Sequence, residues 1–347
     1  MRGALIGFGQ VAQNAHAPAF KRVPGLAIVA AADPSAERRA AAEREIEGLR
    51  AYPSAEALYD AEKGLDFVDV ATPPYAHARD IAAGLERGCH VLCEKPLTFT
   101  MREFEGVSRL ARKRGRALFP IHNWKYAPIL QKLRALVAAG EIGPVRHLEW
   151  HVLRTRPAAV AGTPAADGNW RTSRELSGGG ILMDHGWHAF YLAGWLVGRA
   201  PLSVSGILKS PPGGDTETEA TCLIEYPRTS ALIHLSWNAP RRGHWGVLHG
   251  PEGRIEIFDD RLLLARGTRS PQVFAFPEPL SHGSAHPEWL HAMLGDFLAA
   301  VRRPSRGPGA AALEEARQCR WLLDRLYRRR RAGAKTDSRS RGRGRKR

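Results

Sequence analysis

Cysteine is scarce in this chain, with only 4 in 347 residues, at positions 89, 93, 222 and 319. This spacing matches neither the disulfide framework of a small secreted protein nor the paired Cys-x-x-Cys knuckles of a structural zinc site. The scarcity therefore excludes a disulfide-stabilised scaffold. It favours a reducing compartment, and we expect a cytoplasmic protein.

Long uncharged apolar runs are also missing. A membrane-spanning helix needs about 20 predominantly apolar residues, but the best candidate stretch, 181–198, contains Asp184, His185 and His188. The N-terminal MRGALIGFGQ holds an apolar run too short for a secretory signal and leads directly into a glycine motif. We therefore predict no contact with a membrane.

Acidic residues are nearly absent from the end of the chain. Residues 328–347 hold 11 Lys or Arg and one acid, Asp337, so they carry most of the net charge of +16. The Arg/Gly/Ser composition predicts that 332–347 is a basic, disordered tail. No aromatic pattern of an RNA-binding module accompanies it, so we expect any nucleic-acid binding to involve the tail only.

The length of the chain and its 44% hydrophobic residues predict two globular domains. In the first 120 residues, short apolar runs alternate with helical stretches, as in a parallel sheet with crossover helices. The apolar runs are 4–6, 27–32, 67–71, 90–93 and 117–121, and the helical stretches are 12–22, 36–46, 76–86 and 101–114. We assign residues 1–121 to a Rossmann domain.

The second half of the chain has a different sequence pattern. Successive β-branched runs with Gly, Pro and Asp between them predict a large, mainly antiparallel open sheet. Its expected strands are 145–153, 202–208, 219–226, 230–237, 245–249, 253–258 and 261–265, with helices at 127–139, 180–196, 287–301 and 309–331. We assign residues 122–331 to this second α/β domain.

A glycine motif opens the chain. Gly7-Phe8-Gly9-Gln10-Val11-Ala12 is a G-x-G-x-x-A between a strand and a helix, and Asp33 ends the next strand. This arrangement binds the pyrophosphate and ribose of a dinucleotide. Asp33 would repel the 2′-phosphate of NADP, which favours NAD, whereas Ser35, Arg38 and Arg39 leave NADP possible.

Two further segments follow strands and should line the same crevice, because ligands bind outside the carboxyl ends of the strands in open α/β sheets. They are Thr72–His77 and Glu94–Pro96. Lys95 is then a cation next to the substrate. The predicted cofactor contacts are Gly7, Phe8, Gly9, Gln10, Val11, Ala12, Asp33, Arg38, Thr72, Pro73, His77, Glu94 and Lys95.

The densest group of functional residue types lies between Trp170 and His188. Three glycines, 178–180, predict close approach of a ligand to a helix N-terminus. Asp184 and His188, at i and i+4, share one helix face, which suits His188 as a base and Asp184 as the group that sets its tautomer or shares the hydrogen-bond network to the substrate. His185 should point away from that face, and no His-x-x-x-His lies on a predicted helix, so we expect no metal site.

These motifs together resemble the glucose–fructose oxidoreductase and inositol dehydrogenase family, Gfo/Idh/MocA, over nearly the whole chain to about residue 330. The resemblance implies a Rossmann domain, an open-sheet domain used for dimer or tetramer contacts, and a catalytic set of Lys95, Asp184 and His188. It also implies a cis Lys95–Pro96 bond. The family often has an arginine at the position of Lys125, and the basic tail is no part of its pattern.

We therefore predict an NAD(P)-dependent enzyme that transfers a hydride at a CH–OH carbon of a polyol, sugar or sugar derivative. His188 would take the hydroxyl proton and Lys95 would stabilise charge on the oxygen. The candidate substrate contacts are Asn123, Lys125, Trp170, Arg171 and His286. Two alternatives stay open: an NAD-retaining, glycosidase-like enzyme of the same family, and a non-enzymatic NAD(P)-binding regulator.

Overall fold

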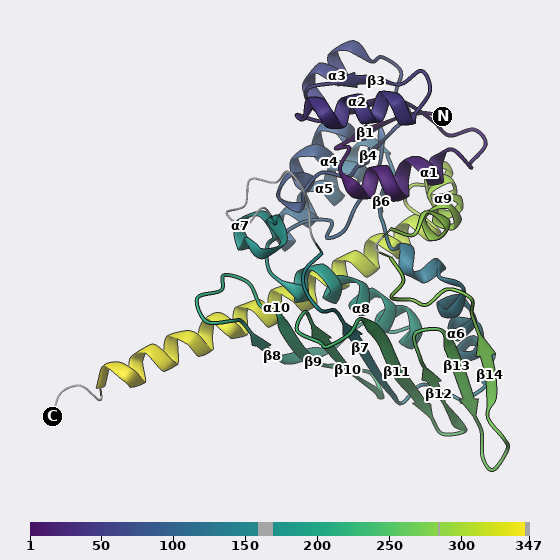
Figure 1. The fold of residues 1–347 in the computed structure, drawn as a ribbon, viewed down its shortest axis with the longest axis vertical. Helices are drawn as coiled ribbons and strands as arrows, with labels where there is room; N and C mark the ends of the chain where they lie inside the picture. Colours follow the sequence, from purple (N-terminus) through teal and green to yellow (C-terminus); the bar gives the residue numbers. More distant parts are fainter. Residues whose placement is uncertain (159–168, 284, 344–347) are drawn as a thin grey trace.

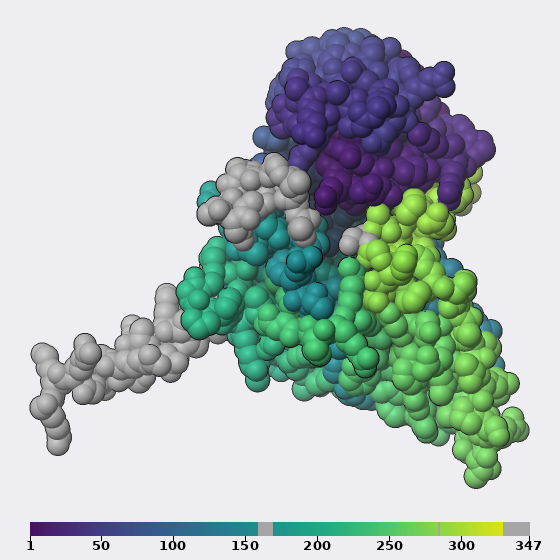
Figure 2. Space-filling model, in the orientation of Figure 1, coloured from purple at the N-terminus to yellow at the C-terminus, as the bar shows by residue number. Residues whose placement is uncertain are grey.

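The computed structural model describes residues 1–158, 169–283 and 285–343. Two sheets form separate lobes, and α10, Pro308–Arg343, passes between them (Figure 1). In the space-filling view the N-terminal lobe, purple to blue, rests on the larger green lobe (Figure 2). The expected two-domain α/β architecture is confirmed.

The N-terminal sheet has six parallel strands in the order β3-β2-β1-β4-β5-β6. The strands are β1 Arg2–Ile6, β2 Ala27–Ala32, β3 Arg50–Tyr52, β4 Phe67–Val70, β5 His90–Cys93 and β6 Leu118–Pro120. Sequence periodicity missed β3, because a strand of three residues offers too short a pattern. This strand order confirms the Rossmann prediction and brings the ends of β1, β4 and β5 together at one edge.

Local sequence signals explain where the helices of this domain begin and end. Ser35 caps α2, and Thr100 with Glu103 forms a complete capping box at α5. Gly115 ends α5 in a left-handed conformation that side chains with a Cβ disfavour. The helical elements are η1 Ala12–His16, α1 Ala17–Phe20, α2 Ala36–Glu45, α3 Ala55–Ala61, η2 Pro74–Ala76, α4 His77–Glu86 and α5 Met101–Arg114.

The second sheet has eight strands in the order β14-β13-β12-β11-β7-β10-β9-β8. Its pairs are antiparallel except for the central pair of β10 with β7, so the sheet is mainly antiparallel as predicted. The strands are β7 His147–Leu153, β8 Ser203–Lys209, β9 Glu219–Tyr226, β10 Thr229–Ser236, β11 Gly243–Gly250, β12 Gly253–Ile257, β13 Arg261–Ala265 and β14 Gln272–Ala275.

Helices cover one face of this sheet (Figure 1). Burial alternates along β7 and β9, which identifies one inward and one outward face. The remaining elements are η3 Asn123–Tyr126, α6 Pro128–Ala138, η4 Trp170–Thr172, α7 Arg174–Ser177, α8 Ile181–Val197 and α9 Pro287–Arg302. The buried α8 packs against β9, β10 and α10, so its first turns lie between the two lobes.

The C-terminal helices differ from the sequence expectation in two ways. α9 completes the core of the N-terminal domain, because Phe297 packs on Phe67 and Phe119 at ring-centroid distances of 5.6 and 6.0 Å. The last helix continues to Arg343, past the end expected at residue 331. Residues 332–343 contain no proline, and helix hydrogen bonds are local, so this segment can be helical without packing. Within the described ranges, no helix is both long and apolar enough to cross a bilayer.

Candidate active site

The glycine loop after β1 has the geometry of a dinucleotide cradle. Gly7 has φ of 90°, and a Cβ there would lie 2.9 Å from both the Ala71 oxygen and the Thr72 nitrogen, so only glycine fits. A Cβ on Gly9 would meet no atom within 4 Å, which leaves the backbone open on that side. The helical turns of Ala12–His16 begin directly behind. These residues therefore fit a dinucleotide pyrophosphate.

Asp33 orders this loop. One carboxylate oxygen accepts the Phe8 amide hydrogen at 2.9 Å, and the other accepts that of Ser35 at 2.9 Å. The guanidinium of Arg38 lies 3.8 Å from the same carboxylate. The predicted specificity pair, Asp33 and Arg38, is therefore brought together behind the glycine loop.

The loops after β4 and β5 are tied together by His77. Its Nδ1 lies 2.8 Å from the Pro96 carbonyl and its Nε2 lies 2.8 Å from the Thr72 carbonyl. The Lys95–Pro96 peptide is cis, as the family resemblance implied. His77 is fully buried, so it holds the two loops in position from behind.

Glu94 points into the N-terminal domain. Its carboxylate lies 3.2 Å from Nε2 of His16, and Nδ1 of His16 lies 2.6 Å from Asp69. Burial opposes a charge on His16, but Asp69 and Glu94 outweigh it and raise its pKa to about 10. The other oxygen of Glu94 accepts the Lys95 amide hydrogen at 2.9 Å. Glu94 thus links the loop that carries Lys95 to the domain core.

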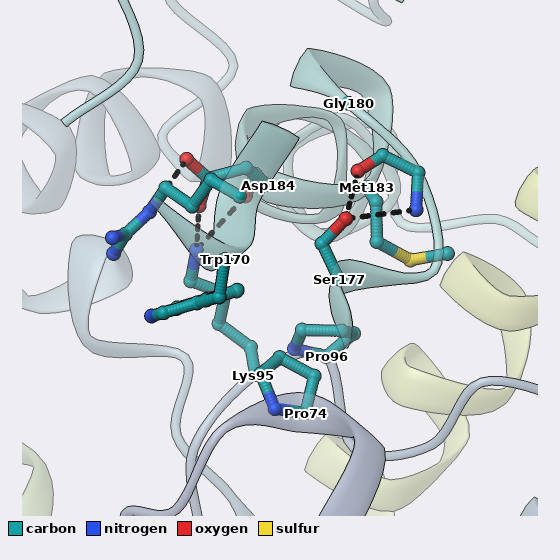
Figure 3. A pocket seen from close by; sticks show the side chains of 10 residues that line it. Pro74, Lys95, Pro96, Trp170, Ser177, Gly180, Met183 and Asp184 are labelled. Atoms are coloured by element: carbon teal, nitrogen blue, oxygen red, sulfur yellow. Dashed lines mark hydrogen bonds and ion pairs between the residues drawn. The ribbon is translucent and has the colours of Figure 1, made fainter. Parts of the chain in front are cut away.

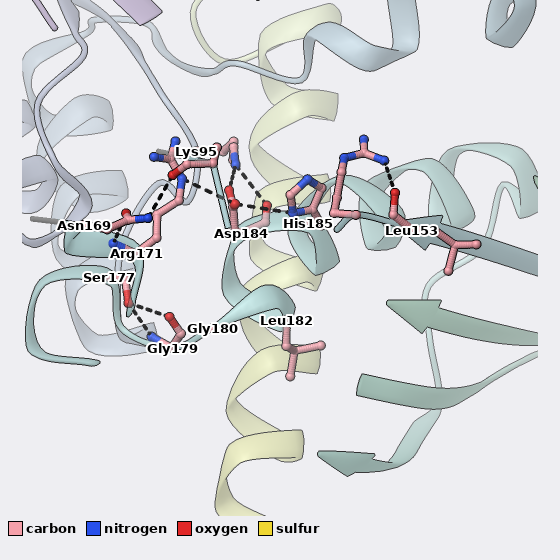
Figure 4. A network of polar contacts seen from close by, with 12 residues as sticks. Lys95, Leu153, Asn169, Arg171, Ser177, Gly179, Gly180, Leu182, Asp184 and His185 are labelled. Carbon is pink, nitrogen blue, oxygen red and sulfur yellow. Dashed lines mark hydrogen bonds and ion pairs between the residues drawn. The ribbon is translucent and has the colours of Figure 1, made fainter. Parts of the chain in front are cut away.

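Lys95 and Asp184 meet across the two domains. The Lys95 ammonium donates to the Asp184 carboxylate at 2.6 Å and to the Asp184 carbonyl at 2.9 Å, and the Arg171 guanidinium lies 3.5 Å from the other carboxylate oxygen (Figures 3 and 4). Burial disfavours a charge on Asp184, but Lys95, His185 and Arg171 outweigh it and hold its pKa well below the usual value. The guanidinium carbon of Arg171 lies over the Trp170 ring, 4.4 Å from the ring centroid. Pro74 and Met183 line the same pocket.

His188 lies one turn further along α8 and is held by two aromatic residues. Its ring stacks on Trp124 at 4.3 Å, and its Nδ1 lies 2.9 Å from the Tyr191 hydroxyl oxygen. Burial, together with the Lys95 charge, keeps the pKa of His188 well below its usual value, so the ring is neutral. With Nδ1 engaged, Nε2 is the nitrogen that can exchange a proton with a ligand.

Two details of the sequence interpretation were wrong. The group at Nδ1 of His188 is Tyr191 and not Asp184, whose carboxylate binds Lys95. His185 does not turn away from Asp184, because its Nδ1 lies 3.3 Å from that carboxylate. Asp184 is at the start of α8, where the chain bends toward the N-terminal domain, so its neighbours come from outside its own helix face.

The three glycines before α8 pack closely against other parts of the protein. A Cβ on Gly180 would overlap the Glu217 backbone, and one on Gly179 would overlap the Tyr327 hydroxyl. The buried Glu217 carboxylate accepts the amide hydrogens of Gly180 at 2.7 Å and Leu182 at 3.2 Å. A protein carboxylate therefore occupies the helix N-terminus that the sequence suggested for a ligand.

The other predicted substrate contacts are not among the residues that line the pocket of Lys95 and Asp184. Lys125 binds Glu315 at 2.8 Å beside a second cavity of about 260 Å³. His286 stacks on Trp289 at 3.5 Å, and burial lowers its pKa to about 4. Asn123 is half-buried in η3 beside Trp124. In the part of the chain that the structure describes, no three His, Cys, Asp or Glu side chains are grouped as metal ligands.

Sequence reasoning missed Trp124, Tyr191 and Glu217. Tyr191, at i+3 from His188, could have been found from helix spacing alone. The other two come from segments far away in the sequence, and no spacing rule connects them with the helix that bears Asp184 and His188.

Comparisons with known proteins match both parts of the chain. A family model described as an oxidoreductase family with an NAD-binding Rossmann fold matches residues 1–122, and a Gfo/Idh/MocA C-terminal domain model matches residues 130–256. D-apiose dehydrogenase of Paraburkholderia graminis is 32% identical over 304 residues, which are 84% of this chain and 76% of that protein. D-glucoside 3-dehydrogenase of Escherichia coli is 32% identical over 200 residues, 57% of this chain and 54% of that protein.

Solved structures show the same fold. Levoglucosan dehydrogenase in complex with NADH and levoglucosan superposes with a TM-score of 0.79 at 20% identity, covering 94% of this chain and 97% of that chain. A 3-ketoreductase from Actinomadura kijaniata, in complex with NADP, has a TM-score of 0.79 at 21% identity, with coverage of 94% and 97%.

Proposed function

Because the chain belongs to the Gfo/Idh/MocA family of NAD(P)-dependent oxidoreductases, we propose that it interconverts a secondary alcohol and a ketone on a polyol, sugar or sugar derivative. The observation that carries this proposal is the convergence of Lys95, Asp184 and His188 where the ends of β4 and β5 meet the start of α8. Relatives named as sugar dehydrogenases and a sugar reductase support the substrate class.

The bound nicotinamide would supply the hydride acceptor or donor. His188 exchanges the hydroxyl proton through Nε2, and its neutral ring can accept that proton during oxidation. The Tyr191 hydroxyl both donates and accepts hydrogen bonds, so it can pair with Nδ1 of His188 in either tautomer of the ring. One tautomer suits oxidation of the alcohol and the other suits reduction of the ketone. The Lys95 ammonium, held by Asp184, stabilises negative charge that develops on the substrate oxygen.

The remaining residues of the site position the ligands. Gly7–Ala12 and Asp33 would hold the pyrophosphate and adenosine ribose, with Thr72, Pro73, Glu94 and His77 shaping the crevice. Trp170 and Arg171 would contact the substrate over the Lys95–Asp184 pair. Three predicted contacts lie outside that pocket and would bind parts of the substrate further from the reacting carbon: Asn123, Lys125 and His286. We further propose that NAD is preferred to NADP, because Asp33 stands where a 2′-phosphate would lie.

We also propose that the enzyme is a cytoplasmic homo-oligomer, a dimer or tetramer. The uncovered face of the second sheet carries exposed apolar side chains, including Ile207, Leu223 and Trp245. Exposed apolar patches of this kind mark protein interfaces. Light scattering on the full chain tests the assembly. We also propose domain limits at residues 121 and 331, with residues 332–347 as an appended segment.

Spectroscopic assay of the full chain tests the proposed reaction. The enzyme is mixed with NAD or NADP and a panel of polyols, aldoses, sugar acids and sugar phosphates, and free reduced nicotinamide is followed by absorbance. We expect substrate-dependent accumulation with at least one member of the panel. Intact cofactor binding with no redox change on any member, in either direction, would contradict the proposal.

A further inference from the structure

Arg154, the residue after β7, holds a buried positive charge. It is 5% exposed. Its Nη1 donates to the Leu153 carbonyl at 2.8 Å and its Nη2 donates to Nε2 of His244 at 2.7 Å, whereas its Nε has no hydrogen-bond partner in the described ranges. Removing an ion from water costs several kcal/mol, and buried arginines are normally paired with a carboxylate for that reason. None of the ion pairs found among the described residues includes Arg154.

His244 beside it presents a second unpartnered donor. Because Nε2 accepts the hydrogen bond from Arg154, the hydrogen of the neutral ring is on Nδ1. Burial and the Arg154 charge hold the pKa of His244 well below its usual value, so the ring stays neutral. Nδ1 is buried and has no acceptor within the described part of the chain. Arg154 Nε and His244 Nδ1 are thus two neighbouring donors without an acceptor in the described ranges, and either can take one from a ligand.

These two donors adjoin the active site. The His244 ring meets the edge of Trp124 at 4.9 Å, and Trp124 stacks on His188 at 4.3 Å, so one indole ring separates His244 from the proton-exchanging imidazole. In Figure 4, Leu153 lies on one side of His185, and Lys95, Asp184 and Arg171 lie on the other. Burial lowers the pKa of His185 to about 3, although the Asp184 carboxylate favours its charged form.

The two carboxylates whose charges act on Arg154, those of Asp184 and Asp259, bind other donors. Lys95 and Arg171 share the Asp184 carboxylate, and the Asp259 carboxylate accepts the backbone N–H groups of His244 and Ser281. Arg242 donates to the Gly283 carbonyl. Its positive charge also disfavours the charged form of Arg154. Burial, followed by the Arg242 charge, lowers the pKa of Arg154 to about 10. Neither Asp184 nor Asp259 forms an ion pair with Arg154 in the described residues.

We propose that the substrate carries an anionic group, a carboxylate or a phosphate, that is bound by Arg154, Arg242 and the Nδ1–H of His244. The proposal rests on the proposed function, since it names the substrate class of the same site. Arginine suits this task because its planar donors match both anions. A neutral sugar would leave the Arg154 charge buried and unpaired, so it would bind more weakly.

Three sugars that differ only at carbon 6 test the proposal: D-glucuronate, D-glucose 6-phosphate and D-glucose. Each is titrated into the NAD-loaded full chain by calorimetry, and turnover is measured separately. We expect at least one anionic sugar to bind tenfold or more tightly than glucose, with a preference that falls as salt rises. The glucuronate and phosphate arms identify which anion is preferred. The absence of a tenfold preference in both arms overturns the proposal.

Variants locate the binding group. Arg154→Gln should abolish the preference, and Arg242→Gln, at an exposed position, should reduce it several-fold without affecting folding. Arg254→Gln is the matched control, because Arg254 is half-exposed on β12 and paired with Glu256. Circular dichroism and NAD affinity verify folding. An undiminished preference in Arg242→Gln, or in a folded Arg154→Gln, shows that the anion binds elsewhere and overturns the assignment.

The same measurements separate this inference from the proposed function. Turnover of neutral sugars without an anion preference would contradict the anionic substrate class and leave the oxidoreductase activity standing. An anion preference in calorimetry, with no redox change on any substrate, would contradict the proposed reaction and leave the binding group standing.

Discussion

The Tyr191 hydroxyl oxygen lies 2.9 Å from Nδ1 of His188 and also accepts the backbone N–H of Trp124 at 3.2 Å. The indole of the same Trp124 covers the face of the imidazole. His188 is therefore fixed in position by an edge contact and a face contact that converge from α8 and η3. Its free nitrogen, Nε2, is oriented by the fold before any ligand binds.

Replacing Tyr191 by Phe removes the hydroxyl and keeps the ring. We expect kcat to fall about tenfold, equivalent to about 1.4 kcal/mol, because the hydrogen bond that orients His188 is lost. Affinity for NAD should stay within twofold, since Tyr191 is remote from the glycine loop. Steady-state kinetics with cofactor titration measure both. A kcat unchanged within twofold, accompanied by a lower Tm, would leave Tyr191 with a purely structural role.

His188→Asn should lower kcat by about 10² to 10⁴, the range typical of a lost general base, with cofactor affinity near that of the wild type. Lys95→Met should be similarly severe, because it removes the charge that stabilises the substrate oxygen. The double mutant should be little worse than either single mutant, since residues that act as a unit give non-additive losses. Additive losses, or an active but destabilised His188→Asn, would remove these residues from the chemistry.

The pH profile of oxidation follows from the state of His188. Burial and the Lys95 charge lower its pKa well below 6.5, so the neutral, proton-accepting ring persists as the pH falls through 6.5. We therefore expect kcat/KM for oxidation to lose no activity from this group as the pH falls through 6.5. Initial rates across a pH series show this directly. An acidic limb centred near 6.5 to 7 would mean that a different, unperturbed base is at work.

Stability should decline at alkaline pH because of His16. Its folded pKa of about 10 exceeds the unfolded value near 6.5, so its contribution is complete below 6.5 and is lost as the pH rises toward 10. The loss should be on the order of a few kcal/mol in the free energy of unfolding. Urea unfolding at a series of pH values measures it. The His16→Gln variant should be less stable at neutral pH and flatter with pH, and equal slopes in both proteins would contradict the prediction.

Cofactor preference should depend on Asp33 and Arg38. Wild type should bind NAD more tightly than NADP, and Asp33→Ala should weaken NAD binding and narrow the difference, because the carboxylate also holds the Phe8 and Ser35 amides. Arg38→Ala should weaken NADP binding more than NAD binding, since a guanidinium can pair with the 2′-phosphate. Fluorescence titration of the three proteins with each cofactor measures all six affinities. A wild type that prefers NADP, with Asp33→Ala unchanged, would contradict this assignment.

The site residues that could be predicted from sequence are those in contiguous motifs. Gly7 and Gly9, the Lys95 loop and the pair Asp184 and His188 each follow a predicted strand or share one helix, so local spacing already located them. The cis Lys95–Pro96 bond came from resemblance to the family and is present.

Tertiary structure decided which of these groups touch. Spacing suggested that Asp184 serves His188, but the cleft between the domains places Lys95 against Asp184 and leaves Tyr191 beside His188. Spacing also suggested a ligand at the glycines before α8, where Glu217 binds instead. Lys95 and Glu217 come from segments distant in sequence from α8, and no local periodicity encodes their approach.

The sequence by itself determined the fold class, most of the strands and the dinucleotide loop, because hydrophobic periodicity and glycine conformation act over a few residues. Only the tertiary structure decided the partner of Asp184, the burial of Arg154 and the packing of α9 on the N-terminal domain. These depend on long-range contacts and on exclusion of water, which exist only once the two sheets and the helices between them have assembled.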